Sequence, residues 1–148
     1  MGCAEGAFDD AIELLRTGRR ARGDALLHER IAESAVELSS AQSLYESVIA
    51  TLHTAGSEFR ALTVGEIRTL RRNRAYLVKL CLKSVGRMLR ELRTAGIQSA
   101  SPIQRHWRDL QVMAAHIDVD WDIAMTEYGA YMLEDQHAPC TNVPYRTI

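Results

Sequence analysis

The feature that most constrains the fold is the near absence of proline: Pro102 is the first proline in the chain, and only Pro139 and Pro144 follow it. Proline breaks a helix interior because it lacks an N–H and clashes with the preceding turn. The first hundred residues can therefore form long helices. Apolar residues also recur at steps of three and four, and we find no strand-like alternation of useful length. The sequence predicts an all-α protein.

The same pattern predicts an antiparallel up-down bundle of four or five helices in one domain, residues 1–134. The expected helices are Gly2–Arg16, Leu26–Ala55, Thr63–Ala95, Pro102–His116 and a last one that runs from Asp118 or Asp120 to Glu134. Thr63 and Glu66 form a capping box, Gly96 is expected to end the third helix, and Ser101 is expected to cap the fourth. The helical period stops after Glu134, so residues 135–148 are expected to be an extended or disordered tail.

The two longest predicted helices each carry an apolar seam. The seams are Ile31, Ala35, Leu38, Tyr45, Ile49 and Leu52 on the first, and Ile67, Leu70, Leu77, Cys81, Ser84, Met88 and Leu92 on the second. Val36, Val48 and Val85 lie off these seams and indicate apolar surface on more than one face. We therefore expect a homodimer or a larger assembly that buries more than roughly 1,000 Å².

Composition excludes several classes of function. A net charge of −1 argues against a general binder of nucleic acid or of anionic membranes, and no apolar run approaches the roughly 20 residues that span a bilayer. Cys3, Cys81 and Cys140 are odd in number and far apart, which favours the reducing cytoplasm. No set of His, Cys, Asp and Glu has the spacing of a metal site, so no metal is expected.

The helix that starts at Pro102 has two distinct faces at 100° per residue. The apolar face is Ile103, Trp107, Leu110, Ala114 and Ile117, and the opposite face is Arg105, Arg108, Asp109, Val112 and His116. One interpretation is a solvated face with an Arg105–Asp109 ion pair. The other is a functional face, on which an arginine holds an anionic group, Asp109 orients an arginine and His116 exchanges a proton.

Two further groups have open interpretations. The run Arg68–Arg74 is either a solvated face or a site for the phosphate of a flavin or of coenzyme A. The aromatic side chains of the last two helices are either core or cofactor contacts; they are Trp107, Trp121, Tyr128 and Tyr131. The remaining histidines have no partner at motif spacing and are expected at the surface; they are His28, His53, His106 and His137.

The segment from Gly96 to Glu134 carries the most specific pattern. A Ser-Pro helix start is followed by Ile-Gln-Arg-x-x-Arg-Asp at residues 103–109, by His116, by Trp121-Asp122 and by Tyr128-Gly129. This order resembles the C-terminal helical domain of the acyl-CoA dehydrogenase superfamily. Within that superfamily, it is similar to the two-component flavin-dependent monooxygenases that hydroxylate phenols with reduced flavin.

The resemblance implies an oxidoreductase of secondary or aromatic metabolism that acts on a small molecule. It implies catalytic roles for His116 and Asp109, and contacts to reduced FMN or FAD by Arg105, Arg108 and Trp121. It also implies a homodimer or tetramer. The family's N-terminal helical domain and middle β-domain have no counterpart in these residues, so we expect flavin only where a partner chain or further domains complete the site.

Two other functions stay open at this point. The bundle could be a flavin-independent biosynthetic cyclase or isomerase with a pocket between its helices. It could also be a non-catalytic oligomerisation module.

Overall fold

The computed structural model describes residues 1–17, 23–98 and 101–134, so the expected tail lies outside the described residues. The elements are α1 (Gly2–Arg16), α2 (Ala25–Ser57), α3 (Val64–Leu92), α4 (Thr94–Ile97), α5 (Pro102–Ala114), the 3₁₀ turn η2 (Ile117–Val119) and α6 (Trp121–Leu133). No strand occurs in the described part of the chain, and the predicted all-α class is confirmed. None of its helices is both long enough and apolar enough to cross a membrane.

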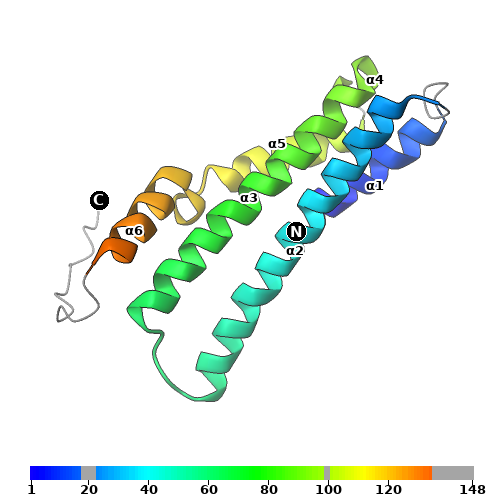
Figure 1. Cartoon of the computed structure of the whole chain (residues 1–148). Coiled ribbons are helices and arrows are strands. Elements are labelled where there is room, and N and C mark those ends of the chain that lie inside the picture. The colour runs from blue at the N-terminus through cyan, green and yellow to red at the C-terminus, as the bar shows by residue number, and fades with distance from the viewer. Residues whose placement is uncertain (18–22, 99–100, 135–148) are drawn as a thin grey trace.

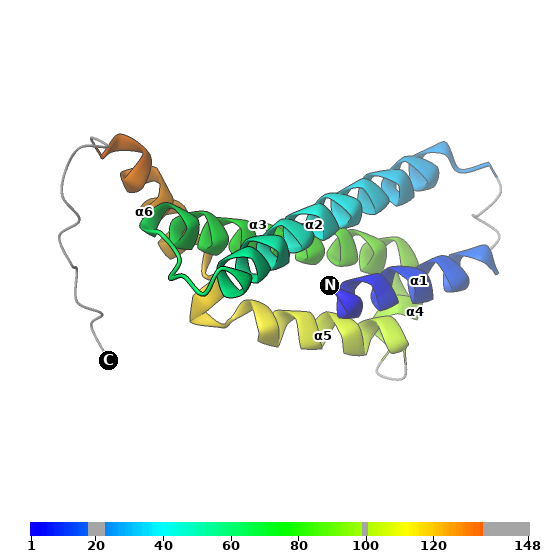
Figure 2. The ribbon, with the colours of Figure 1, turned by 90° about the horizontal axis from the view of Figure 1, so that it is seen from below.

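Helix α3 is the centre of the bundle, because α1, α2, α5, η2 and α6 all pack against it. Helices α2 and α3 run antiparallel along most of their length, while α1 and α5 cover the C-terminal half of α3 (Figures 1 and 2). Helix α6 lies against the N-terminal half of α3 (Figure 1). The antiparallel helical bundle expected from the sequence is confirmed, with α6 as an extension at one end.

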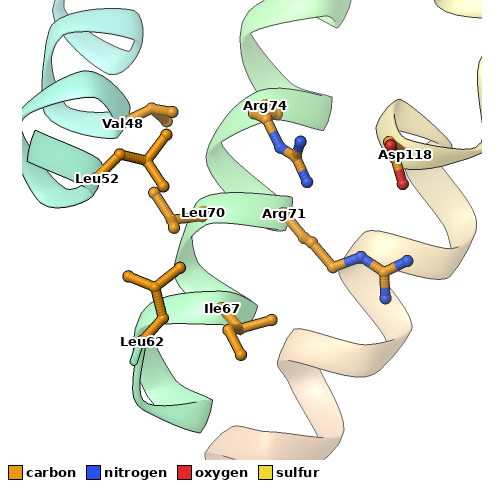
Figure 3. Close-up of a pocket in the computed structure, with 8 residues that line it drawn as sticks. All are labelled: Val48, Leu52, Leu62, Ile67, Leu70, Arg71, Arg74 and Asp118. Carbon is orange, nitrogen blue, oxygen red and sulfur yellow. The ribbon is translucent and has the colours of Figure 1, made fainter. Parts of the chain in front are cut away.

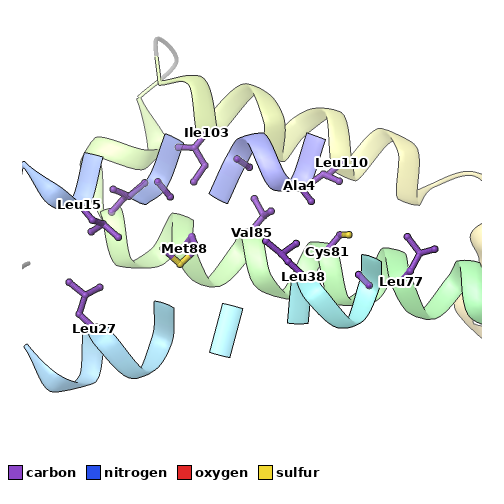
Figure 4. Close-up of a cluster of buried hydrophobic side chains, with 14 residues drawn as sticks. Ala4, Leu15, Leu27, Leu38, Leu77, Cys81, Val85, Met88, Ile103 and Leu110 are labelled. Carbon is purple, nitrogen blue, oxygen red and sulfur yellow. The ribbon is translucent and has the colours of Figure 1, made fainter. Parts of the chain in front are cut away.

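The core lies between α1, α3, α5 and the N-terminal half of α2 (Figure 4). Its buried members are Ala4, Ala7, Ala11, Leu15, Leu27, Leu38, Ala41, Leu77, Cys81, Val85, Met88, Leu92, Ile103 and Leu110. Small side chains on α1 let that helix approach α3 and α5 closely. The seam predicted for α3 is buried except at Ile67.

The seam predicted for α2 is wrong at Ala35 and over its C-terminal half. Ala35, Tyr45, Ile49 and Leu52 are exposed, whereas Val48, which we placed off the seam, is buried. Val85 is also buried in the core, so of the three off-seam valines only Val36 is exposed. The reason is that small and polar residues, as well as leucines, fill the buried face of α2. The buried residues of this helix are Leu27, Ser34, Glu37, Leu38, Ala41, Val48 and Ala55.

A buried ion pair joins α2 to α3. The Arg87 guanidinium donates two hydrogen bonds to Glu37, with Nη1–Oε2 at 2.6 Å and Nη2–Oε1 at 2.9 Å. It also donates to Ser34 Oγ at 2.8 Å, and Lys83 Nζ lies 2.7 Å from the same carboxylate. The side chains of Arg87 and Glu37 are only 6% and 9% exposed. Because an unpaired charge at this depth would be costly, the pair fixes how the two long helices align.

Helix starts follow the sequence more closely than helix ends. The capping box of Thr63 and Glu66 is present, as predicted. Ser101 occupies the N-cap position of α5 before Pro102, but its side chain makes no capping hydrogen bond, and its buried Oγ has no partner among the described residues. The predicted N-cap position is therefore correct, but the capping hydrogen bond from its side chain is absent.

The third helix ends at Leu92 rather than at Ala95, because Arg93 has a left-handed φ of 53° and breaks it. Gly96 therefore does not end α3 but lies in the short α4. An added Cβ there would lie 2.9 Å from the Leu92 Cβ and 3.1 Å from the Leu89 carbonyl oxygen. Gly96 is needed for this close approach of the backbone rather than as a terminator.

Candidate functional site

The junction between α5 and α6 presents His116 to solvent. Helix α5 ends at Ala114, two residues before the predicted end, and His116 has extended backbone as the N-cap of η2. Its Nδ1 accepts a hydrogen bond from the Asp118 N–H at 3.2 Å. Its side chain is 67% exposed, so it lies beyond the helical face on which we expected it.

This hydrogen bond sets the tautomer of His116. Since Nδ1 accepts a hydrogen bond from the backbone N–H of Asp118, the neutral imidazole carries its proton on Nε2. Within the described part of the chain, Nε2 makes no hydrogen bond, and the Asp118 carboxylate lies 3.7 Å from Nδ1. The largely exposed side chain therefore offers an N–H donor to solvent or to a ligand.

Arg105, Arg108 and Asp109 are exposed on α5. The Arg105–Asp109 ion pair is not formed among the described residues, so the simplest form of the solvated-face interpretation is not observed. Asp109 instead acts towards α1: burial, and then the charge of Asp109, raise the pKa of the Cys3 thiol.

Trp121 begins α6 and holds it against α3. Its ring lies 5.9 Å from the Tyr76 ring, and Lys79 Nζ lies 3.3 Å from the Trp121 ring centroid. These contacts are typical of an aromatic anchor with a cation–π partner. Asp120 caps the same helix by accepting from the Ile123 N–H at 2.9 Å, so the α5–α6 junction is well fixed at its second end.

The arginine run Arg68–Arg74 is not a solvated face. Arg68 and Arg71 both donate to the Glu127 carboxylate of α6, Arg71 at 2.6 Å. Arg72 lies 4.2 Å from the centre of the Tyr128 ring. Arg74 has a buried Nε without a partner in the described structure. The run therefore docks α6 onto α3.

Two cavities border this run. The first, of about 240 Å³, is lined by Val48, Leu52, Leu62, Ile67, Leu70, Arg71, Arg74 and Asp118 (Figure 3). The second, of about 440 Å³, is lined by Thr51, Thr63, Gly65, Glu66, Thr69, Leu70, Asn73, Tyr128, Tyr131 and Met132. Neither lining includes Arg105, Arg108, Asp109, His116 or Trp121, so the predicted site residues lie outside these two cavities.

Sequence reasoning missed a contact between α1 and α5. His106, which we expected at the surface, is half-buried, with Nε2 3.3 Å from Asp10 Oδ2 and Nδ1 3.6 Å from Cys3 Sγ. The raised pKa of Cys3 keeps the thiol protonated at neutral pH, so this group is a packing contact rather than an activated nucleophile. No sequence signal could have found it, because its members are about a hundred positions apart.

The predicted site residues present polar groups to solvent: the His116 imidazole is largely exposed, and Arg105 and Arg108 carry exposed guanidinium groups, which suit an anionic ligand. The larger cavity lies elsewhere, and the 240 Å³ cavity is below the range of about 300–1,000 Å³ that is usual for ligand pockets. Among the described residues, no group of three His, Cys, Asp or Glu side chains could hold a metal ion.

Comparisons with known proteins agree with this fold. The p-hydroxyphenylacetate 3-hydroxylase oxygenase component of Acinetobacter baumannii is 27% identical over 104 residues, which are 70% of this chain and 25% of that protein. The FADH(2)-dependent resorcinol hydroxylase oxygenase component of Rhizobium sp. (strain MTP-10005) is 30% identical over 108 residues, 70% of this chain and 26% of that protein. The chain thus spans about a quarter of the length of these relatives.

A solved structure and a family model extend the similarity. XiaF from Streptomyces sp., solved in complex with FADH2 and glycerol, superposes with a TM-score of 0.82 at 20% identity, over 95% of this chain and 37% of that one. The model of the acyl-CoA dehydrogenase C-terminal domain matches residues 1–121. The chain therefore belongs to the acyl-CoA dehydrogenase C-terminal domain family.

Proposed function

We propose that this chain forms the C-terminal helical part of the oxygenase component of a flavin-dependent monooxygenase, which hydroxylates a small phenolic substrate. Two relatives are hydroxylase oxygenase components by name, and one of them is FADH(2)-dependent. A structure of the same fold holds FADH2. Because the chain spans about a quarter of the relatives, the proposal places the rest of the flavin site on further residues of the same protein or on a partner chain.

The observation that carries the proposal is the geometry of His116. Its Nδ1 is held by the Asp118 N–H, and its Nε2 faces outward at the start of the α5–α6 junction. An imidazole nitrogen can donate or accept a proton, so this side chain can give a proton to a substrate oxygen or take one from it. Fixing one nitrogen while exposing the other is how proteins orient a general acid or base.

The other predicted site residues have supporting roles in this proposal. Reduced FMN or FAD, when bound, supplies the electrons with which O₂ gives one oxygen atom to the substrate and one to water. Arg105 or Arg108 holds an anionic group of the flavin or substrate. Asp109 orients an arginine, and Trp121 borders the flavin from the start of α6.

The proposal includes self-association and a cytoplasmic location. Large apolar side chains remain exposed on the single chain, among them Val36, Tyr45 and Ile49. A homodimer or tetramer would cover such a surface. Cys3 and Cys81 are both free thiols, which fits a reducing compartment.

The test is turnover with reduced flavin. The chain is supplied together with the further domains or the partner chain that complete the flavin site, mixed anaerobically with reduced FMN or FAD, and then exposed to O₂ and either 4-hydroxyphenylacetate or resorcinol as the probe substrate. We expect an O₂-dependent product that is one oxygen atom heavier than the probe, detected by mass spectrometry. A folded protein that yields no such product with either flavin and either probe contradicts the proposal. A product that forms without flavin would instead support the flavin-independent enzyme.

A further inference from the structure

We propose that the 240 Å³ cavity between α2, α3 and η2 binds a small organic monocarboxylate with an apolar body, whose carboxylate is held by Arg71 and Arg74. The cavity adjoins the His116 junction through Asp118, which lines it and donates its backbone N–H to His116, but His116, Arg105 and Arg108 do not line it. Ligand binding in the cavity is measured without turnover, so its failure is distinguishable from a failure of the proposed function.

One side of the cavity is an aliphatic wall. Figure 3 shows Val48 and Leu52 on α2, Leu62 just before α3, and Ile67 and Leu70 in the first turns of α3, while Arg71 extends from α3 away from α2. Val48 and Leu70 are buried, but Leu52 and Ile67 remain exposed at the rim. A ring or a branched chain in the cavity would remove this rim from water, which favours an apolar body.

The other side of the cavity has an excess of positive charge. Arg68 and Arg71 share one partner, the Glu127 carboxylate, so the three groups together carry a net positive charge. Arg74 adds a further guanidinium, whose buried Nε has no partner in the described structure. A buried N–H without an acceptor is unfavourable, and a carboxylate oxygen is the acceptor that a guanidinium binds best.

Asp118 limits the charge of the ligand. Its carboxylate lines the same cavity from η2, opposite the aliphatic wall. A second negative charge on the ligand would lie near this carboxylate and be repelled by it. The cavity should therefore prefer a monoanion such as a carboxylate to a dianion such as a phosphate monoester.

The volume limits the size of the ligand. At roughly 30 Å³ per water molecule, a cavity of 240 Å³ corresponds to about eight waters. That space suits one aromatic ring, or a short branched chain, with its carboxylate. A dinucleotide or a coenzyme A thioester would not fit.

The experiment is a titration of the full chain with benzoate, followed by backbone amide NMR. We expect shifts that cluster at Val48, Leu70 and Arg74. The neutral isostere benzamide and the dianion phenyl phosphate should each bind at least about tenfold more weakly, as should benzoate to Arg74→Met, because each change removes or opposes a charge-assisted hydrogen bond. Arg90→Met, at an exposed position of the same helix, serves as the matched control and should bind benzoate like the wild type.

A second variant protects the test against a folding defect in Arg74→Met. Leu52→Trp places a larger side chain at the exposed rim and should also weaken benzoate binding at least about tenfold while the amide spectrum stays folded. The proposal is overturned if benzoate causes no shifts at these residues. It is also overturned if benzamide binds as tightly as benzoate, or if folded Arg74→Met and Leu52→Trp both bind like the wild type.

Discussion

At the level of single residues, the main feature of this bundle is the buried ion pair between Glu37 on α2 and Arg87 on α3. Glu37 and Arg87 are buried together, and Lys83 and Ser34 supply the remaining hydrogen bonds. Such a pair adds little net stability compared with apolar packing, but losing one partner strands a buried charge. The pair therefore affects stability mainly because the loss of either partner leaves the other charge buried and unpaired.

The first prediction follows directly. Arg87→Met should lower the free energy of unfolding by about 3 kcal/mol, because Glu37 keeps only the exposed Lys83 as a counter-charge. Arg16→Met removes a pair whose side chains are 73% and 75% exposed and should cost less than about 1 kcal/mol. Urea unfolding of both variants checks this. Equal losses for the two would show that burial does not govern the pair.

Two carboxylates whose pKa values are lowered in the folded protein, Glu37 and Glu66, predict how its stability responds to acid. Burial alone would raise the pKa of Glu37, but hydrogen bonds from Arg87 and Lys83 outweigh burial and lower it. Hydrogen bonds from Arg60 and from the Thr63 backbone lower the pKa of Glu66 to about 2.

A carboxyl whose pKa is lowered by folding stabilises the protein above its unfolded pKa, and that stabilisation is lost as the pH falls through the folded pKa. We therefore expect the urea midpoint to fall steadily as the pH is lowered from about 4.5 towards 2. In Glu37→Gln this fall should be shallower. If the urea midpoint of that variant falls with pH as steeply as that of the wild type, Glu37 does not contribute to the loss of stability in acid.

Gly86 gives a prediction about packing rather than charge. An added Cβ there would lie 3.2 Å from the Trp107 ring, so Gly86→Ala must displace the indole that packs between α3 and α5. We expect a loss of about 1–3 kcal/mol, the usual cost of overpacking a core. Gly129 meets nothing within 4 Å, so Gly129→Ala should stabilise α6 by up to about 1 kcal/mol. Thermal unfolding that shifts both variants in the same direction would contradict this.

At the scale of elements, the helices were predictable but their buried faces were only partly so. Caps, prolines and helical spacing are local signals, and they located every long helix within a few residues. The seam of α2 failed because sequence reasoning favours large apolar residues, whereas this helix buries small and polar ones at steps of seven, among them Ser34, Ala41, Val48 and Ala55. The ends of α3 and α5 also depended on backbone geometry at Arg93 and His116.

The candidate site, too, was predictable from the sequence only in part. The placement of His116 next to the α5–α6 junction could be anticipated because it follows from sequence order and a short break. The docking of α6 by Arg68, Arg71 and Glu127 could not, since those residues lie more than fifty positions apart. A charge run looks the same in sequence whether it meets water or a carboxylate from another helix.

At the scale of the whole molecule, exposed apolar surface predicts an assembly. Tyr45 and Ile49 are exposed on α2 and do not line the ligand cavity. Light scattering at micromolar concentration should therefore give the mass of a dimer or tetramer. Tyr45→Lys and Ile49→Lys together should shift that mass towards the monomer, because buried charges oppose association. A wild-type monomer at that concentration would contradict the prediction.

The central claim is that the α5–α6 junction acts on substrate through His116, and one comparison of variants tests it most directly. Reduced-flavin-dependent hydroxylation is measured, with the flavin site completed by the further domains or the partner chain, for the wild type, His116→Ala, His116→Asn and His53→Ala. Asparagine can keep the cap on the Asp118 N–H without an ionisable ring, and His53 is an exposed histidine on α2 that serves as the control. We expect both His116 variants to lose about 10²-fold or more in turnover, while their melting temperatures stay near that of the wild type and His53→Ala keeps full activity. If His116→Asn and His116→Ala keep wild-type turnover per folded molecule, or lose stability rather than turnover, His116 is structural and the claim is wrong.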